Sequence, residues 1–279
     1  MHRLPSLPAV DNAPAELLSG HLWIVELIDG RPLRFQLQES GLIRVGDADR
    51  VYDDPKSVPL PLQQAVAHIR ELIDRTALRA ALDDVTAITF FGVATTREST
   101  PYELASMPPF LGTDVWADDD ETLRPPDATH GIFERLGLNP VNTFEREVHA
   151  RDFAVNRYEM PSSAWYDGPP AGVVIRNKQG HRAQLPNPIR STPVASPEST
   201  DSAPRLSVDA LVDKYASTER IDMIAAAVNA DNGSVDVDTV TDRLCAVIGR
   251  RQPAVFLGTD TLDQSALRSA IAEQVHQQL

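Results

Sequence analysis

Two tight turns near the N-terminus constrain the fold more than any other feature of the chain. Residues 22–28 are mostly apolar and include the β-branched Ile24, Val25 and Ile28. Asp29-Gly30 is a strong turn sequence, and residues 33–37 alternate between apolar and polar. A second turn at Glu39-Ser40-Gly41 leads into residues 42–45. The pattern predicts three short antiparallel strands in a meander, with Asp29-Gly30 closing the first hairpin.

The middle of the chain mixes strand and helix patterns. Apolar residues at helical spacing predict an amphipathic helix over residues 61–78 and a short helix over 127–136. Strands are predicted over residues 86–94, 110–116, 172–177 and 181–185, the last two forming a hairpin. We therefore expect an α+β fold with a largely antiparallel core.

Composition divides the chain into three parts. We expect a first domain over residues 1–185, a linker rich in Pro, Ser and Thr over 186–205, and a small helical domain over 206–279. Helices in the last part are predicted over residues 207–215, 218–228 and 237–248, with a final helix opened by a capping box of Thr261 and Gln264. The single cysteine, Cys245, falls on an apolar helix face and is predicted to be buried.

The charge balance is strongly acidic. The net charge is −14, and only three lysines stand beside twenty-three arginines. This composition is typical of salt-loving microbes, although an ordinary acidic cytoplasmic protein is the alternative. An acidic surface repels nucleic acid, but this repulsion weakens in concentrated salt, where the Debye length is about 3 Å at 1 M. The best local basic patch is predicted at Arg176, Lys178, His181 and Arg182.

Other common sites and locations find little support in the sequence. No apolar run approaches the length of a membrane span, and residues 1–20 lack the apolar core of a signal peptide, so we expect a cytoplasmic protein. The histidines and the single cysteine lack the spacing of a zinc site. No metal ligand is predicted from the residues themselves.

Five segments then occur in a recognisable order. They are Glu26-Leu27-Ile28-Asp29-Gly30, its continuation through Arg34-Phe35, Phe90-Phe91-Gly92-Val93-Ala94, Pro108 to Trp116, and Ala171-Gly172-Val173-Val174-Ile175-Arg176-Asn177 followed by Arg182-Ala183-Gln184-Leu185. From about residue 21 to residue 185 the chain resembles the ATP-dependent RNA ligase family. The corresponding family patterns include Glu-Lys-x-Asp-Gly, Phe-Phe-Gly-Glu-Ala, Glu-Gly-Val-Val-Ile-Arg-Asn and Arg-Ala-Lys-Leu.

The resemblance implies a covalent nucleotidyltransferase fold. In these ligases a lysine attacks the α-phosphate of ATP, forms lysyl-AMP and passes the nucleotide to an RNA 5′-phosphate. It implies ATP and Mg²⁺ as cofactors and RNA ends as partners, with Glu26 accepting from the adenine amino group and Arg34 beside the phosphates. The nucleotide-binding positions that it implies are Glu26, Ile28, Asp29, Gly30, Arg34, Gly172 and Arg176.

The departures from the family pattern fall on the positions that carry its chemistry. Leu27 replaces the lysine and has no lone pair with which to attack phosphorus. Val93 and Ala171 replace glutamates that serve the divalent metal. Gln184 replaces the lysine at the α-phosphate, and Thr113 stands where an aromatic ring could stack on adenine. No catalytic residue is therefore predicted.

We expect a degenerate RNA-ligase-like protein without autoadenylation that retains nucleotide or RNA-end binding. A first alternative is an active ligase or adenylyltransferase with an unconventional nucleophile, although Lys56, Lys178 and Lys214 all lie far from the Asp29-Gly30 turn in sequence. A second alternative is a structural partner of an active ligase or repair protein, engaged through the C-terminal helices. The sequence leaves open the nucleotide, RNA against DNA, the partner, the oligomeric state and the pathway.

Overall fold

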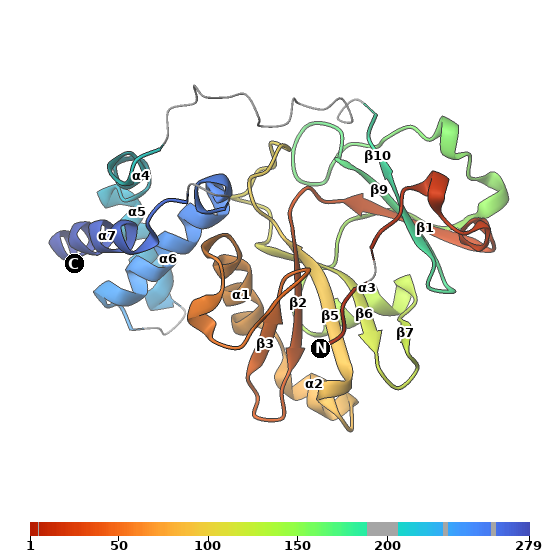
Figure 1. Cartoon of the computed structure of the whole chain (residues 1–279), viewed down its shortest axis with the longest axis horizontal. Helices are drawn as coiled ribbons and strands as arrows, with labels where there is room; N and C mark the ends of the chain where they lie inside the picture. The colour runs from red at the N-terminus through yellow and green to blue at the C-terminus, as the bar shows by residue number, and fades with distance from the viewer. Residues whose placement is uncertain (5, 189–205, 231–233, 258–260) are drawn as a thin grey trace. The chain divides into compact units, whose positions relative to one another are not determined.

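The computed structural model describes residues 1–4, 6–188, 206–230, 234–257 and 261–279 (Figure 1). Its contacts divide into two units. The N-terminal unit comprises Met1–Ser57 and Ala65–Val194, and the helical unit comprises Val58–Gln64 and Ala195–Leu279. Most of the predicted linker, residues 189–205, lies outside the described residues. No described helix is both long enough and apolar enough to cross a membrane.

Two antiparallel sheets form the N-terminal unit. The first has the order β10-β9-β1-β8 and consists of β1 (His21–Leu27), β8 (Thr143–His149), β9 (Gly172–Asn177) and β10 (Arg182–Pro186). The second has the order β4-β3-β2-β5-β6-β7 and consists of β2 (Arg31–Leu37), β3 (Ile43–Gly46), β4 (Val51–Tyr52), β5 (Ile88–Ala94), β6 (Phe110–Ala117) and β7 (Thr122–Leu123). This arrangement confirms the predicted α+β class with an antiparallel core.

The turn at Asp29-Gly30 does not close a hairpin, contrary to the sequence prediction. β1 pairs with β8 and β9, whereas β2 pairs with β3 and β5, so the turn carries the chain from one sheet to the other. A Cβ on Gly30 would lie 2.6 Å from both Ala94 O and Val93 Cγ1, which fixes Gly30 tightly against β5. The second turn is confirmed as a β2–β3 hairpin, with Gly41 at a φ of 86°.

Stacked aromatic rings form much of the core behind the second sheet. The rings of Phe35 and Phe90 stack with centroids 4.8 Å apart, and Phe133 packs edge-on against Phe90 at 6.0 Å. All three side chains are fully buried. Phe133 belongs to α3 (Pro126–Arg135), close to the predicted helix over 127–136. Burying one such ring contributes about 1.5–3 kcal/mol, so this group anchors α3 on the sheet.

The helix predicted over residues 61–78 is interrupted by a cap. The structure has α1 (Leu60–Leu72) and α2 (Arg75–Ala81) instead of one helix. Asp74 has extended backbone angles, and its carboxylate accepts a hydrogen bond from Ala77 N at 2.8 Å. An N-cap of this kind starts a new helix because it satisfies one of the free N–H groups of the first turn.

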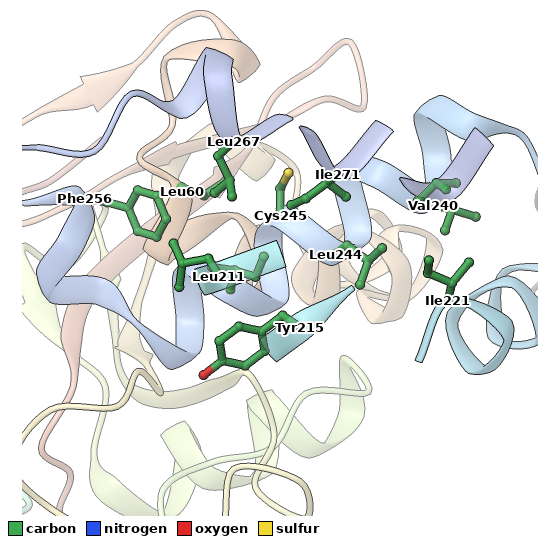
Figure 2. Packing of buried hydrophobic residues seen from close by; sticks show 12 residues of the cluster. Leu60, Leu211, Tyr215, Ile221, Val240, Leu244, Cys245, Phe256, Leu267 and Ile271 are labelled. Carbon is green, nitrogen blue, oxygen red and sulfur yellow. The ribbon is translucent and has the colours of Figure 1, made fainter. Parts of the chain in front are cut away.

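The helical unit has its own apolar core. Its helices are α4 (Val208–Tyr215), α5 (Thr218–Ala230), α6 (Val237–Arg251) and α7 (Gln264–Gln278). Figure 2 shows side chains such as Leu211, Leu244 and Ile271 gathered in one cluster, which also includes Leu60 from the first turn of α1. Cys245 is buried in it, as predicted, and burial raises the pKa of its thiol to about 11.

The last helix begins differently from the prediction. Asp263, rather than Thr261, caps α7, because its carboxylate accepts hydrogen bonds from Ser265 N and Ala266 N. The other predicted helices of this unit agree with α4, α5 and α6. Short 3-10 turns complete the described elements: Val10–Asn12, Ala15–Leu18, Pro55–Ser57, Val85–Ala87, Ala150–Asp152, Val155–Arg157 and Pro253–Phe256.

Candidate functional site

A cavity of about 340 Å³ lies in the N-terminal unit, where the chain passes from β1 in the first sheet to β2 in the second sheet. Both sheets contribute to its wall. Most of the wall is apolar and includes Val25, Leu27, Ile28, Leu33, Phe91, Val93, Val141 and Val174. Cavities that hold small organic ligands are about 300–1,000 Å³, are mostly apolar and carry a few polar groups, so this one has a suitable size and character.

The cavity brings together most, but not all, of the site residues predicted from the sequence. Its wall contains Glu26, Leu27, Ile28, Gly30, Arg34, Val93, Thr113 and Arg176. Asp29, Ala171, Gly172 and Gln184 are described residues that lie outside the wall. The turn at the end of β1 therefore supplies the largest share of the predicted positions.

Glu26 is held by the protein itself. Its side chain is 1% exposed, and its carboxylate accepts hydrogen bonds from Ser163 Oγ at 2.5 Å, Asn142 Nδ2 at 3.2 Å and Ala164 N at 3.3 Å. Burial raises the pKa of this carboxyl, while the three donors oppose that rise. Both carboxylate oxygens therefore already have protein partners, which limits what they can offer a ligand.

A buried ion triad forms another part of the wall. Asp114, on β6, contacts Arg176 Nη2 at 2.8 Å and Arg182 Nη1 at 2.9 Å. All three side chains are less than a tenth exposed. Burial alone would raise the pKa of Asp114, but the two guanidinium charges hold it below its usual value. Arg176 also donates to Thr113 O at 2.6 Å, so its guanidinium is committed on two sides.

This triad contradicts the predicted basic patch on the β9–β10 hairpin. Arg176 and Arg182 point into the protein toward Asp114 rather than into solvent. Lys178 is more exposed, but it pairs with Glu147 at 2.8 Å and approaches Asp127 at 4.0 Å. The sequence places these basic residues close together on a hairpin, but alternation along β9 and β10 sends two of them inward.

Arg34 is the third arginine of the wall. It is 5% exposed, its Nη1 donates to His2 O at 3.0 Å, and its buried Nε has no hydrogen-bond partner among the described residues. Burial and repulsion from Arg3 lower the pKa of its guanidinium, while Asp47 and Asp49 oppose this shift. Arg34 therefore contributes to the cavity wall a buried guanidinium that the His2 carbonyl engages.

Asp47 is the third acidic residue of the wall, and its carboxylate is also engaged by its surroundings. Its carboxylate accepts hydrogen bonds from Asp49 N at 2.8 Å, from Arg50 N at 2.7 Å and from the Tyr52 hydroxyl. Burial favours its neutral form, but these donors outweigh that effect and lower its pKa. They hold the turn that follows β3 and fix Ala48 in the cavity wall.

The predicted positions outside the wall have structural contacts. Asp29 Oδ2 accepts from Ser99 Oγ at 2.7 Å, Thr100 N at 2.8 Å and Thr100 Oγ1 at 2.9 Å, which ties down the loop after β5. Gly172 is needed for close packing, since a Cβ there would lie 2.5 Å from Leu185 O. Ala171 O accepts a hydrogen bond from Asn187 N at 2.9 Å.

Gln184 faces the N-terminal residues instead of the cavity. Its Nε2 donates to Leu7 O at 3.0 Å, and its backbone N–H donates to Pro8 O at 2.8 Å. Residues 1–4 and 6–9, here called the N-terminal strap, also place Leu4, Ser6 and Leu7 in the cavity wall. The polar group that resemblance assigns to a phosphate contact is thus occupied by the protein's own backbone.

The cavity does not fit a divalent metal. Among the described residues its acidic side chains are Glu26, Asp47 and Asp114, and each is engaged by donors or by arginines. Val93 has no oxygen in its side chain, and neither has Ala171. Mg²⁺ requires oxygen ligands in octahedral geometry, usually with several waters, so the wall lacks a free anionic anchor for it.

The sequence interpretation missed several wall residues. Asp47 and Asp114 were not assigned, and neither were Leu4, Ser6 and Leu7 of the strap. Asp114 could have been assigned to the site from the sequence. It lies within the Phe110–Trp116 segment, and alternation along a strand puts its side chain on the opposite face from its neighbours. The strap residues could not be assigned from the sequence, because nothing in residues 1–9 indicates pairing with a strand 175 residues away.

Comparisons with known proteins were informative only at the level of structure. The sequence matches no protein-family model and no curated protein. Among solved structures, a mutant of Naegleria gruberi RNA ligase with ATP and Mn matches with a TM-score of 0.53 and 11% identity, over 68% of this chain and 57% of that one. This chain has the fold of an RNA ligase.

Two further structures of that protein agree. Another mutant with ATP and Mn has a TM-score of 0.52 at 11% identity, over 67% of this chain and 55% of the ligase. The ligase with PPi has a TM-score of 0.51 at 11% identity, over 67% and 56%. The chain thus spans little more than half of the ligase in each of these three structures. At such low identity the likeness extends to the RNA-ligase fold and not to the activity.

Proposed function

We propose that this protein is an RNA-ligase-like protein that does not form lysyl-AMP and that binds a nucleotide or an RNA end non-covalently in the cavity. The observation that carries the proposal is the position of Leu27. Its side chain lies in the cavity wall beside Glu26 and Ile28, and in the motif that the chain resembles this position belongs to the nucleophilic lysine. A hydrocarbon side chain cannot form a phosphoramidate.

The other lysines offer no substitute nucleophile. Lys178 is held by Glu147 and Asp127 on the β9–β10 hairpin, and this pairing raises the pKa of its ammonium. A nucleophilic amine needs the opposite shift, toward the neutral form. Lys56 lies in an exposed 3-10 turn, and Lys214 lies in α4 of the helical unit. None of the three lines the cavity.

The binding part of the proposal is supported by the cavity itself. It has the volume of a small-molecule site, an apolar wall and one buried arginine, Arg34, that is not paired with an acidic side chain of the wall. Thr113 and Arg176 add polar groups on the side of β6 and β9. An apolar cavity with a few convergent polar groups is the usual form of a ligand site.

The test of the chemistry is covalent labelling. The purified chain is incubated in high salt with ATP labelled at the α-phosphate and with Mg²⁺ or Mn²⁺, then denatured and separated. We expect no label on the protein, while an active RNA ligase in the same buffer is labelled. Covalent label on the wild-type chain would overturn the proposal and call for mapping of the nucleophile.

Matched variants separate a lost nucleophile from a changed site. Leu27→Lys alone is expected to gain little label, because Val93, Ala171 and Gln184 still lack the charges that phosphoryl transfer requires. The quadruple change Leu27→Lys, Val93→Glu, Ala171→Glu and Gln184→Lys is expected to label more strongly. Equal labelling of the single and quadruple variants would contradict this account.

The test of binding is separate. Equilibrium titration of the wild-type chain with adenosine, AMP, ATP and a short 5′-phosphorylated RNA asks whether any member of the class is held without a covalent bond. Saturable binding that the cavity-filling change Val93→Trp abolishes supports the proposal. If none of the four ligands binds, the proposal that the cavity binds a nucleotide or RNA end is wrong. The proposal that the chain forms no lysyl-AMP then remains.

A further inference from the structure

We infer that the cavity selects an uncharged ligand of nucleoside size over a nucleoside triphosphate, because the N-terminal strap engages Arg34 and the other two arginines of the wall are already paired with Asp114. This inference rests on the proposed function and specifies its ligand. The strap comprises residues 1–4 and 6–9, as defined above. Its contacts reach both sheets, and three of its side chains form part of the cavity wall.

The strap is tied to the second sheet through His2. The backbone N–H of His2 donates to Thr89 Oγ1 at 3.0 Å, and its carbonyl oxygen accepts from Arg34 Nη1 at 3.0 Å. The His2 ring stacks on Trp116 with centroids 3.8 Å apart and an angle of 8° between the planes. A neutral carbonyl therefore uses one of the donors of Arg34, which among the described residues is the one wall arginine not paired with Asp114.

The strap is tied to the first sheet through Gln184. Gln184 Nε2 donates to Leu7 O at 3.0 Å, its backbone N–H donates to Pro8 O at 2.8 Å, and Ala9 forms a parallel bridge with it. The strap thus runs from β2 and β5 to β10. A strand edge that would otherwise offer donors to a ligand is covered by an extended segment of the same chain.

The charge balance of the wall also disfavours a triphosphate. Its charged side chains are Glu26, Asp47 and Asp114 against Arg34, Arg176 and Arg182, so their formal charges cancel. Two of the arginines are already neutralised by Asp114. Transfer of a multiply charged phosphate chain into a buried site is very unfavourable without matching positive charge. An uncharged nucleoside avoids that penalty.

The experiment compares adenosine with metal-free ATP by calorimetric titration of the full-length chain. We expect the Kd for ATP to be at least about tenfold larger than that for adenosine, because the extra phosphates find no free donors. In a chain that lacks residues 2–9, this ratio is expected to fall by at least about tenfold, because Arg34 is released from the His2 carbonyl and can bind a phosphate. Pro8→Ala is the matched control, since it keeps the strap carbonyls, and it should leave the ratio unchanged.

A second variant guards against failure of the deletion to fold. The double change Leu4→Gly and Leu7→Gly keeps the chain length, removes apolar contacts of the strap and should shift the ratio in the same direction. Two results would overturn the inference: ATP binding as tightly as adenosine to the wild-type chain, or a ratio unaffected by both strap variants. Tight ATP binding without covalent label would contradict this inference but not the proposed function. Covalent label would contradict the proposed function itself.

Discussion

The side chain on which the cavity wall depends most is Asp114. It is the shared partner of Arg176 and Arg182, and all three are buried. Removing the anion leaves two buried cations without compensation, which typically costs about 3–5 kcal/mol. We therefore expect Asp114→Asn to lower the free energy of unfolding by about that amount in urea titrations. Asp53→Asn is the control, because its exposed pair with Arg44 contributes at most about 1 kcal/mol.

The same pair of proteins should differ in pH dependence. The pKa of Asp114 is lowered in the folded state by the two arginines, so its stabilising effect is present above the unfolded pKa of about 3.9. It is lost as pH falls through the lower, folded-state value. The stability difference between wild type and Asp114→Asn should thus be constant near neutrality and shrink below about pH 3.9. A difference that instead grows toward acid pH would contradict the assignment.

At the scale of elements, the corner between β1 and β2 creates the site, and Gly30 makes that corner. An added Cβ would lie 2.6 Å from Ala94 O, which belongs to the backbone and cannot rotate away. We expect Gly30→Ala to lower the free energy of unfolding by about 1–3 kcal/mol, the usual range for overpacking. It should also weaken adenosine binding, because Gly30 and Val93, which the added Cβ would also contact, both line the cavity.

A second glycine provides a matched control. Gly131 lies within α3, and a Cβ there meets nothing within 4 Å. Gly131→Ala should therefore stabilise the protein by up to about 1 kcal/mol through helix propensity. Thermal or urea unfolding of the two variants gives opposite signs if the close approach at Gly30 is the cause. Destabilisation by both would instead point to a general intolerance of alanine.

Elements with local determinants were predictable from the sequence. The β2–β3 hairpin, the β9–β10 hairpin and α3 follow from turn residues and periodicity within about fifteen residues. The β1–β2 corner was predicted wrongly, because Asp-Gly is equally suited to a hairpin and to a turn between sheets. What decides between them is the contact of Gly30 with Ala94, sixty-four residues away, and no local pattern carries that information.

The residues of the candidate site were likewise predictable only where a continuous segment of sequence determines them. Positions on the β1–β2 segment, such as Leu27 and Arg34, were found because the motif is continuous in sequence. Gln184 was assigned from resemblance to a phosphate contact, yet it pairs with the strap, whose residues have no distinctive pattern. Contacts between distant segments therefore account for most of what the sequence left unassigned.

At the scale of the whole molecule, the dominant property is charge. A net charge of −14 repels itself in the folded state, where the acidic groups are brought close together. Salt weakens this repulsion because the Debye length falls from about 10 Å at 0.1 M to about 3 Å at 1 M. Most buried pairs, such as Asp114 with Arg176, are screened much less. Added salt should thus weaken the repulsion between surface charges without breaking the buried ion pairs in the cavity wall.

We expect the midpoint of thermal unfolding to rise when KCl is increased from 0.1 M to 1 M. A gain of about 1 kcal/mol corresponds to roughly 2–4 °C for a chain of this size. The control is the double variant Asp83→Lys and Asp119→Lys, at two exposed positions, which makes the net charge four units less negative. Its midpoint should start higher at low salt and respond less to KCl. An equal response of both proteins would indicate that salt acts through general burial of apolar surface rather than through charge.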